Sequence, residues 1–207
     1  MRMMPGELFH WLAAIGAGFL LGSVMFSEII PRRVLHIDIE AVSDDGNPGS
    51  GNVFLHCGPF WGFVCLLLDM AKGFLPVFCA LHRLGPNHLL FCAVLAAPVL
   101  GHAIAPFNHF HGGKCIATAF GELIALLPVT WIVLVLAGVY ILLSTVMKIP
   151  STRVRSIAAF SLFGIIAAAL LVRRSQLPIA LGCVLISTVA VVRHRRPEDG
   201  KTPPRDA

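Results

Sequence analysis

Charged residues are scarce in this chain of 207 residues, and long apolar runs take their place. Only 13% of the residues are charged and 57% are hydrophobic, whereas soluble domains carry about 25% charged residues. A soluble globular fold is therefore excluded, and an integral membrane protein is predicted. The net charge of +5 does not indicate a nucleic-acid partner, because most Lys and Arg residues flank apolar segments, as topology signals do.

Paired cysteine spacings and internal repeats are also lacking. The six cysteines have no CxxC spacing and lie mostly in apolar runs, so neither a disulfide framework nor a zinc site is expected. Only Cys115, beside Lys114, is weighed as a catalytic thiol. No repeat typical of transporters is visible. We expect no metal and no cofactor.

The apolar runs predict an all-α polytopic transmembrane helical bundle with five to seven crossings, of which seven is favoured. A single helix broken at Pro128 is the alternative for two short runs. Residues 1–196 are predicted to form one membrane domain, and the polar, proline-rich segment 197–207 a disordered cytoplasmic tail. The runs fall near 8–30, 60–81, 89–105, 116–127, 129–147, 157–172 and 179–192.

The distribution of positive charge predicts the orientation of the bundle in the cell membrane. With the long 32–59 loop inside, most Lys and Arg residues are cytoplasmic, and the N-terminus is outside and the C-terminus inside. Every segment that carries a motif then lies on the cytoplasmic face. The basic residues left outside are Arg2, Arg83, Arg173 and Arg174.

The segment SDDGNPGSGN at 43–52 is dense in Gly, Asn and Asp. Such residues arrange successive N–H groups into a concave anion site, and the amides of Asn47 and Asn52 can bond hydroxyl or phosphate oxygens. The alternative is an ordinary surface turn. The candidates here are Asp45, Gly46, Asn47, Gly49 and Asn52.

Asp69 and Lys72 lie three residues apart in an apolar run, so they share a helix face and can pair. Charges at membrane depth are costly and face the protein interior. Asp69 and Lys72 are therefore predicted either to contact substrate directly or to form a structural ion pair.

The stretch at 101–121 is the most informative. Gly112 and Gly113 precede Lys114, and bare backbone beside a lysine suits a phosphate; an interfacial turn is the alternative. His102 and His111 lie nearby, but their spacing matches no metal-ligand signature. Near the chain's end, Arg193 reads as a stop signal, whereas His194 is a candidate phosphate ligand or base.

Together these segments resemble the membrane acyl-phosphate:glycerol-3-phosphate acyltransferase family (the PlsY type) over nearly the whole chain. The glycine-lysine stretch is the specific signal. The matching motifs are Gly22-Ser23, GNPG at 46–49 with Asn52, LDMAKGFLPV at 68–77, GH…F..F.GGK.IATAFG at 101–121 and RH at 193–194.

The resemblance implies transfer of a fatty acyl group from acyl phosphate to the sn-1 hydroxyl of glycerol 3-phosphate, forming lysophosphatidic acid for phospholipid synthesis. It implies catalytic roles for Lys114, His194 and Asp45. Membrane lipids are the other expected partners. The substrate-binding residues implied are Gly46, Asn47, Gly49, Asn52, Asp69, Lys72, His102, His111, Gly112, Gly113, Thr118 and Arg193.

The chain departs from the family pattern in its charged and polar residues. Asp45 stands at the place of a functional serine, and Leu55 at that of an arginine. His111 and Pro197 replace a lysine and an asparagine. We expect these changes to weaken phosphate binding at the first loop. The missing charge is expected from Arg32, Arg33, Arg195 or Arg196.

Two further functions stay open on the sequence. One is an acyltransferase with a different phosphorylated acceptor, which the altered loop favours. The other is a non-catalytic role in binding or transporting anionic lipid, for which Asp69 and Lys72 would line a path.

Overall fold

The computed structural model describes residues 5–195, and the predicted tail at 197–207 lies outside them. Within that range the chain is helical throughout, with no strand, which confirms the predicted all-α class. The helices are α1 (Pro5–Gly22), α2 (Phe26–Ile30), α3 (Ile39–Val42), α4 (Ser50–Cys57), α5 (Pro59–Leu84), α6 (Phe91–Ile104), α7 (Ile116–Ala125), α8 (Val133–Ile141), α9 (Thr152–Arg173) and α10 (Leu177–Arg195).

Five segments of the described chain are long and apolar enough to cross a membrane: Gly6–Leu35, Pro59–Leu84, Phe91–Asn108, Thr152–Arg173 and Leu177–Arg195. Two apolar segments are shorter, Ile116–Ala125 and Val133–Val146. The break between α7 and α8 covers seven residues around Pro128 and Trp131, so these runs form two helices rather than one. Five crossings meet the length that a bilayer requires; the favoured count of seven stays a prediction.

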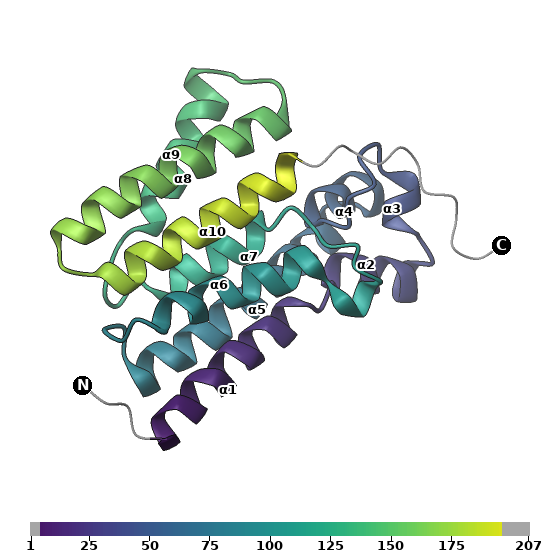
Figure 1. Ribbon diagram of the computed structural model, residues 1–207. Helices are drawn as coiled ribbons and strands as arrows, with labels where there is room; N and C mark the ends of the chain where they lie inside the picture. The colour runs from purple at the N-terminus through teal and green to yellow at the C-terminus, as the bar shows by residue number, and fades with distance from the viewer. Residues whose placement is uncertain (1–4, 196–207) are drawn as a thin grey trace.

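The long helices run side by side, and α2, α3 and α4 gather at one end of the bundle (Figure 1). The end of α10 points toward that same end, opposite the start of α1. The core between the helices is filled by large buried side chains, among them Phe91, Phe160 and Phe163. Large apolar side chains such as Phe9 and Ile165 are exposed on the outside, as a lipid-facing surface requires.

Glycines bring two pairs of these helices, α1 with α6 and α5 with α7, into backbone contact. A Cβ on Gly22 of α1 would meet the backbone of Pro98, and one on Gly101 of α6 would meet the carbonyl of Phe19. Gly121 of α7 lies equally close to the carbonyl of Met70 in α5. Such close approach is how small residues join membrane helices.

The segment at 32–59 differs from the open loop predicted for it. It carries a π-helical turn, Pro31–Leu35, and then α3 and α4. The side chain of Asp38 caps α3 by accepting from the N–H of Ala41 at 3.2 Å, a favoured N-cap contact. Residues 50–52, counted as turn in the sequence, form the first turn of α4. This segment therefore has a defined shape, and it forms one wall of the site.

Candidate functional site

The turn before α4 is organised around the carboxylate of Asp45. Its Oδ1 accepts hydrogen bonds from the side-chain amide of Asn52 at 2.8 Å and from the N–H of Asn47 at 3.1 Å. The Asn52 amide also donates to the carbonyl of Asn47 at 2.8 Å. Gly46 takes a positive φ of 58° to close the turn, a conformation that glycine adopts without strain. The predicted donors therefore bind the carboxylate of Asp45, which belongs to the chain itself, rather than the oxyanion of a ligand.

Lys114 completes this arrangement from the other side. Its Nζ lies 2.6 Å from Oδ2 of Asp45, with both side chains mostly buried. Burial opposes the charge of Asp45, but the hydrogen bonds from Lys114 and Asn52 outweigh it and lower the pKa of this carboxyl below its ordinary value. The glycine-lysine stretch and the first loop therefore meet at this ion pair.

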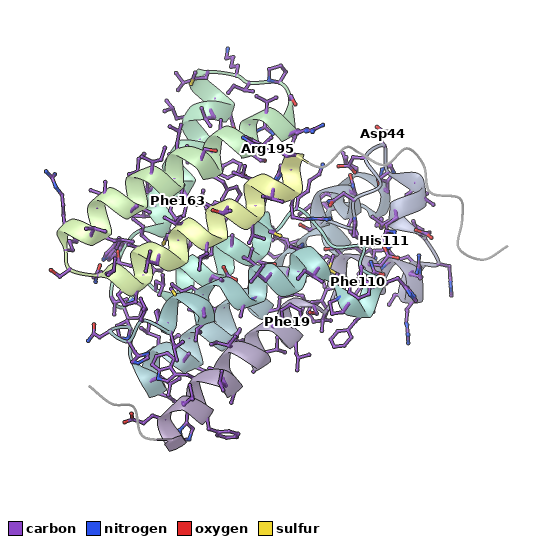
Figure 2. The ribbon with its side chains drawn as sticks, viewed as in Figure 1. Phe19, Asp44, Phe110, His111, Phe163 and Arg195 are labelled. Carbon is purple, nitrogen blue, oxygen red and sulfur yellow. The ribbon has the colours of Figure 1, made fainter. Side chains whose placement is uncertain are left out.

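A pocket of about 620 Å³ opens at this meeting point. Figure 2 shows Asp44, His111 and Arg195 at the same end of the molecule. Of the predicted site residues, the pocket wall includes Asp45, Asn47, Gly49, Asn52, Asp69, His102 and Lys114. The predicted residues that do not line it are Gly46, Lys72, His111, Gly112, Gly113, Thr118, Arg193 and His194.

Gly112 and Gly113 pack closely against the end of α6. A Cβ on Gly112 would meet the carbonyls of His102 and Ala103, and one on Gly113 would meet the His102 ring. The N–H of Gly113 donates to the carbonyl of His102 at 3.1 Å. The two glycines thus press the loop against the end of α6, which fixes the position of Lys114.

Arg193 holds the same loop from α10. Its Nε donates to the carbonyl of Gly113 at 3.2 Å, and its Nη2 donates to the carbonyl of Gly112. The predicted stop signal is therefore also a clamp on the glycine pair, eighty residues earlier in the chain. A planar guanidinium suits such a two-point contact.

His194 is buried, with 1% of its surface exposed, and does not line the pocket. Its Nδ1 lies 2.7 Å from the carbonyl of Ala190, so Nδ1 carries the proton and Nε2 keeps its lone pair. Among residues 5–195, Nε2 has no hydrogen-bond partner. The positive charges of Lys114 and Arg153 lie close enough to interact electrostatically with the His194 ring. A neutral imidazole with an unused acceptor beside cations is able to bond a protonated phosphate or take a proton.

Asp69 and Lys72 form a buried ion pair in α5. Nζ of Lys72 lies 2.9 Å from Oδ1 of Asp69 and donates to the carbonyl of Val24 at 2.5 Å. The hydroxyl of Ser27 donates to Oδ2 of Asp69 at 2.5 Å. These contacts favour a structural ion pair over direct contact with substrate, because the pair joins α5 to the segment between α1 and α2 and to α2 itself.

The remaining predicted residues differ in their surroundings. His111 is exposed, and its Nδ1 lies 3.0 Å from the carbonyl of His109. Thr118 is fully buried in α7, where its carbonyl lies against Gly73. Neither side chain reaches the pocket wall. Cys115 is buried at 1% exposure, and burial raises the pKa of its thiol to about 12. A thiolate nucleophile is therefore disfavoured at this position.

Four polar wall residues lie outside the motifs identified in the sequence: His56, Ser151, Thr152 and Arg153. The last three begin α9, and the hydroxyl of Ser151 caps that helix by accepting from the N–H of Val154 at 3.3 Å. A serine after Pro150 is an N-cap signal. It predicts a helix start, but only the fold brings that start to Lys114.

The arginines expected to compensate for the altered loop lie elsewhere. Arg32 is paired with Glu28 and Asp38, both at 2.8 Å. Neither Arg33 nor Arg195 lines the pocket, and Arg196 lies outside the described residues. None of the three described arginines therefore lies on the pocket wall, and compensation by these residues stays a prediction.

Known proteins are similar to this chain over most of its length. The family model for glycerol-3-phosphate acyltransferase matches residues 12–198. A protein named glycerol-3-phosphate acyltransferase from Shewanella sediminis is 34% identical over 191 residues, covering 89% of this chain and 86% of its own. One of the same name from Thermotoga petrophila is 38% identical over 137 residues, covering 63% of this chain and 68% of its own.

Solved structures of PlsY, described as an integral membrane glycerol 3-phosphate acyltransferase, share the fold. The glycerol 3-phosphate form superposes with a TM-score of 0.77 and the lysophosphatidic acid form with 0.74. Each is 27% identical to this chain and covers 90% of this chain and 88% of its own.

Proposed function

Because this chain belongs to the glycerol-3-phosphate acyltransferase family, we propose that it transfers a fatty acyl group from acyl phosphate to the sn-1 hydroxyl of glycerol 3-phosphate. The product is lysophosphatidic acid, an intermediate of phospholipid synthesis. The observation that carries this proposal is the pocket in which Lys114 meets the turn at 45–52. A relative whose structure is described with glycerol 3-phosphate supports the choice of acceptor.

The pocket suits a reaction that needs positioning rather than a covalent intermediate. An acyl phosphate is a mixed anhydride, so its acyl carbon is already activated. The hydroxyl oxygen of the acceptor attacks that carbon, the carbon–oxygen bond to phosphate breaks, and inorganic phosphate leaves with the hydroxyl proton. Catalysis then consists of aligning two anions and stabilising the charge on the departing phosphate.

Lys114 is assigned to the phosphate of the acyl donor. In the structure its ammonium is held by Asp45, which occupies the place an oxyanion takes. When the donor phosphate arrives, it competes with that carboxylate for Lys114 and for the donors of Asn47 and Asn52. His194 is assigned to hydrogen-bond the departing phosphate through Nε2, the nitrogen without a partner among residues 5–195.

We propose that this pocket faces the cytoplasm, with the N-terminus of the chain outside and the C-terminus inside the cell membrane. Two observations support this orientation. Helix α4, whose residues line the pocket, lies at the end of the bundle where α10 ends (Figure 1), and Arg193 and Arg195 follow the last apolar run at that end. Basic residues after a span favour the cytoplasmic side. A water-soluble acceptor would enter there.

A different phosphorylated alcohol is the second candidate acceptor, and Asp45 favours it. Its carboxylate lines the pocket, where it repels an anion but accepts hydrogen bonds from hydroxyl groups. A polyol phosphate with more hydroxyls than glycerol 3-phosphate would use that acceptor. Competition between glycerol 3-phosphate and longer polyol phosphates, measured with one acyl donor, separates the two candidates.

Product analysis tests the main proposal. Purified protein in detergent is given palmitoyl phosphate and glycerol 3-phosphate, and lysophosphatidic acid is measured by mass spectrometry. Lys114→Ala is expected to lower the yield by roughly a hundredfold or more, because a preorganised charge at the phosphate is lost. If the native protein forms no more product than folded Lys114→Ala, the activity is refuted.

A further inference from the structure

Arg153 at the start of α9 contributes to the pocket wall together with Ser151 and Thr152. Resting on the function proposed above, we propose that Arg153 binds the phosphate of the acceptor, glycerol 3-phosphate, while Lys114 binds the phosphate of the acyl donor. Both substrates carry a phosphate, so two cationic positions are needed in one pocket. The structure supplies them from the loop before α7 and from the first turn of α9.

The balance of charge in the pocket requires a cation besides Lys114. Asp45 lies 2.6 Å from Lys114 and neutralises much of its charge. Within residues 5–195, no carboxylate lies within ion-pair distance of Arg153. Among the described residues of the wall, the guanidinium of Arg153 is therefore a positive charge without a paired carboxylate. Guanidinium groups also match phosphate oxygens with two parallel hydrogen bonds.

Local contacts hold the Arg153 side chain in place before any substrate arrives. Its Nη2 donates to the carbonyl of Arg195 at 2.7 Å, which ties α9 to the end of α10. The cap from Ser151 fixes the first turn of α9. That turn also presents N–H groups without intrahelical partners, and the N-terminus of a long helix favours an anion. A preformed site loses less entropy on binding.

The place of Arg153 on the wall matches the acceptor rather than the donor. Ser151 and Thr152, its neighbours on the wall, are exposed to the surroundings, so this side forms the mouth of the pocket. Glycerol 3-phosphate is small and water-soluble and arrives through the mouth. The acyl donor is anchored by its chain in the lipid, and its phosphate reaches Lys114, which lies just before α7.

Arg153 is also distinguished from the other arginines near this end of the bundle. Arg193 uses its guanidinium to clamp the carbonyls of Gly112 and Gly113. Arg155 is two residues further along α9, but its Nη1 donates to the carbonyl of Ile149 at 3.1 Å and it does not line the pocket. Arg155 therefore offers a matched control on the same helix turn.

The test compares kinetic constants for the two substrates. Arg153→Gln is expected to raise KM for glycerol 3-phosphate by about ten- to a hundredfold, the range for losing a hydrogen bond to a charged group. The KM for palmitoyl phosphate should change by less than about threefold. Arg153→Lys keeps the positive charge but loses the paired N–H donors of the guanidinium. Its KM for glycerol 3-phosphate should lie between those of the native protein and Arg153→Gln. Arg155→Gln should leave both constants close to those of the native protein.

A second-site variant separates charge from structure. Leu55 lines the same pocket and is 78% exposed, so an arginine fits there. Leu55→Arg in the Arg153→Gln protein is expected to restore at least a third of the lost affinity on a logarithmic scale. A merely structural role for Arg153 predicts no such rescue.

The outcomes separate this inference from the proposed function. A native protein that makes lysophosphatidic acid, with KM for glycerol 3-phosphate unchanged in folded Arg153→Gln, overturns the role of Arg153 alone. A rise confined to the KM for palmitoyl phosphate overturns the assignment of the two phosphates. A native protein without product refutes the function, and equilibrium binding of glycerol 3-phosphate against glycerol still tests Arg153. Equal binding by the native and Arg153→Gln proteins would then refute its role.

Discussion

Lys114 and Asp45 form an ion pair of 2.6 Å although they are 69 residues apart in the sequence. The carboxylate also accepts from Asn47 and Asn52, so three donors from two segments surround one oxyanion. This arrangement is what a phosphate site needs. Its present occupant is a side chain, so Asp45 competes with every anionic substrate.

Replacing Asp45 by serine is therefore expected to improve the enzyme. Without the carboxylate, Lys114 and the Asn donors meet a substrate phosphate with no internal competitor, and an opposing charge is removed. We expect KM for the phosphorylated substrates to fall roughly three- to tenfold in Asp45→Ser, as initial-rate measurements would reveal. Asp44→Ser makes the same change in net charge without a contact to Lys114, and its gain should be smaller. Lower activity in Asp45→Ser would contradict this account and favour a direct role for the carboxylate.

The same ion pair predicts a pH dependence of stability. The pKa of Asp45 is lowered in the folded protein, so its contribution is fully present above the pKa of an unfolded aspartate and is lost as the pH falls through the lowered value. The difference in thermal midpoint between the native protein and Asp45→Asn should be constant near neutral pH. It should shrink only in acid, below the usual pKa of aspartate. A difference that disappears already at mildly acidic pH would refute the lowered pKa.

The buried pair of Asp69 and Lys72 predicts strong coupling in stability. Asp69→Asn leaves the Lys72 ammonium buried without its carboxylate, which is expected to cost about 3–5 kcal/mol. The double variant Asp69→Asn with Lys72→Met removes both charges and should be more stable than Asp69→Asn alone. Equilibrium unfolding in mixed micelles measures all members of the cycle. Additive effects of the two substitutions would show that the pair is not coupled.

Substitution of Gly112 is expected to destabilise the fold, because a new side chain there meets backbone atoms that cannot rotate away. In Gly112→Ala the new Cβ meets the carbonyls of His102 and Ala103, and the backbone of α6 must shift. A loss of about 1–3 kcal/mol is expected, with a further loss of activity because Lys114 is displaced. Gly138→Ala is the matched control, since a Cβ there meets open space. Thermal melting in detergent measures both, and equal midpoints would refute the packing role.

The fold class and much of the site followed from the sequence, for identifiable reasons. Low charge and long apolar runs predict a membrane bundle, and the glycines beside Lys114 predict an anion site from local sequence alone. Arg153 was not identified as a site residue, because its proposed role depends on where α9 begins relative to Lys114. No local sequence pattern encodes that distance. Asp45 was identified, but its pairing with Lys114 could be inferred only once α4 was placed.

The hold of Arg193 on the carbonyls of Gly112 and Gly113 has a consequence for biosynthesis. The ribosome makes the glycine pair eighty residues before the arginine that secures it, and α10 must enter the bilayer before the clamp exists. Until then the loop bearing Lys114 lacks two of its hydrogen bonds. The nascent enzyme thus becomes competent only after α10 has been inserted, so a chain stalled short of α10 would reside in the membrane without activity.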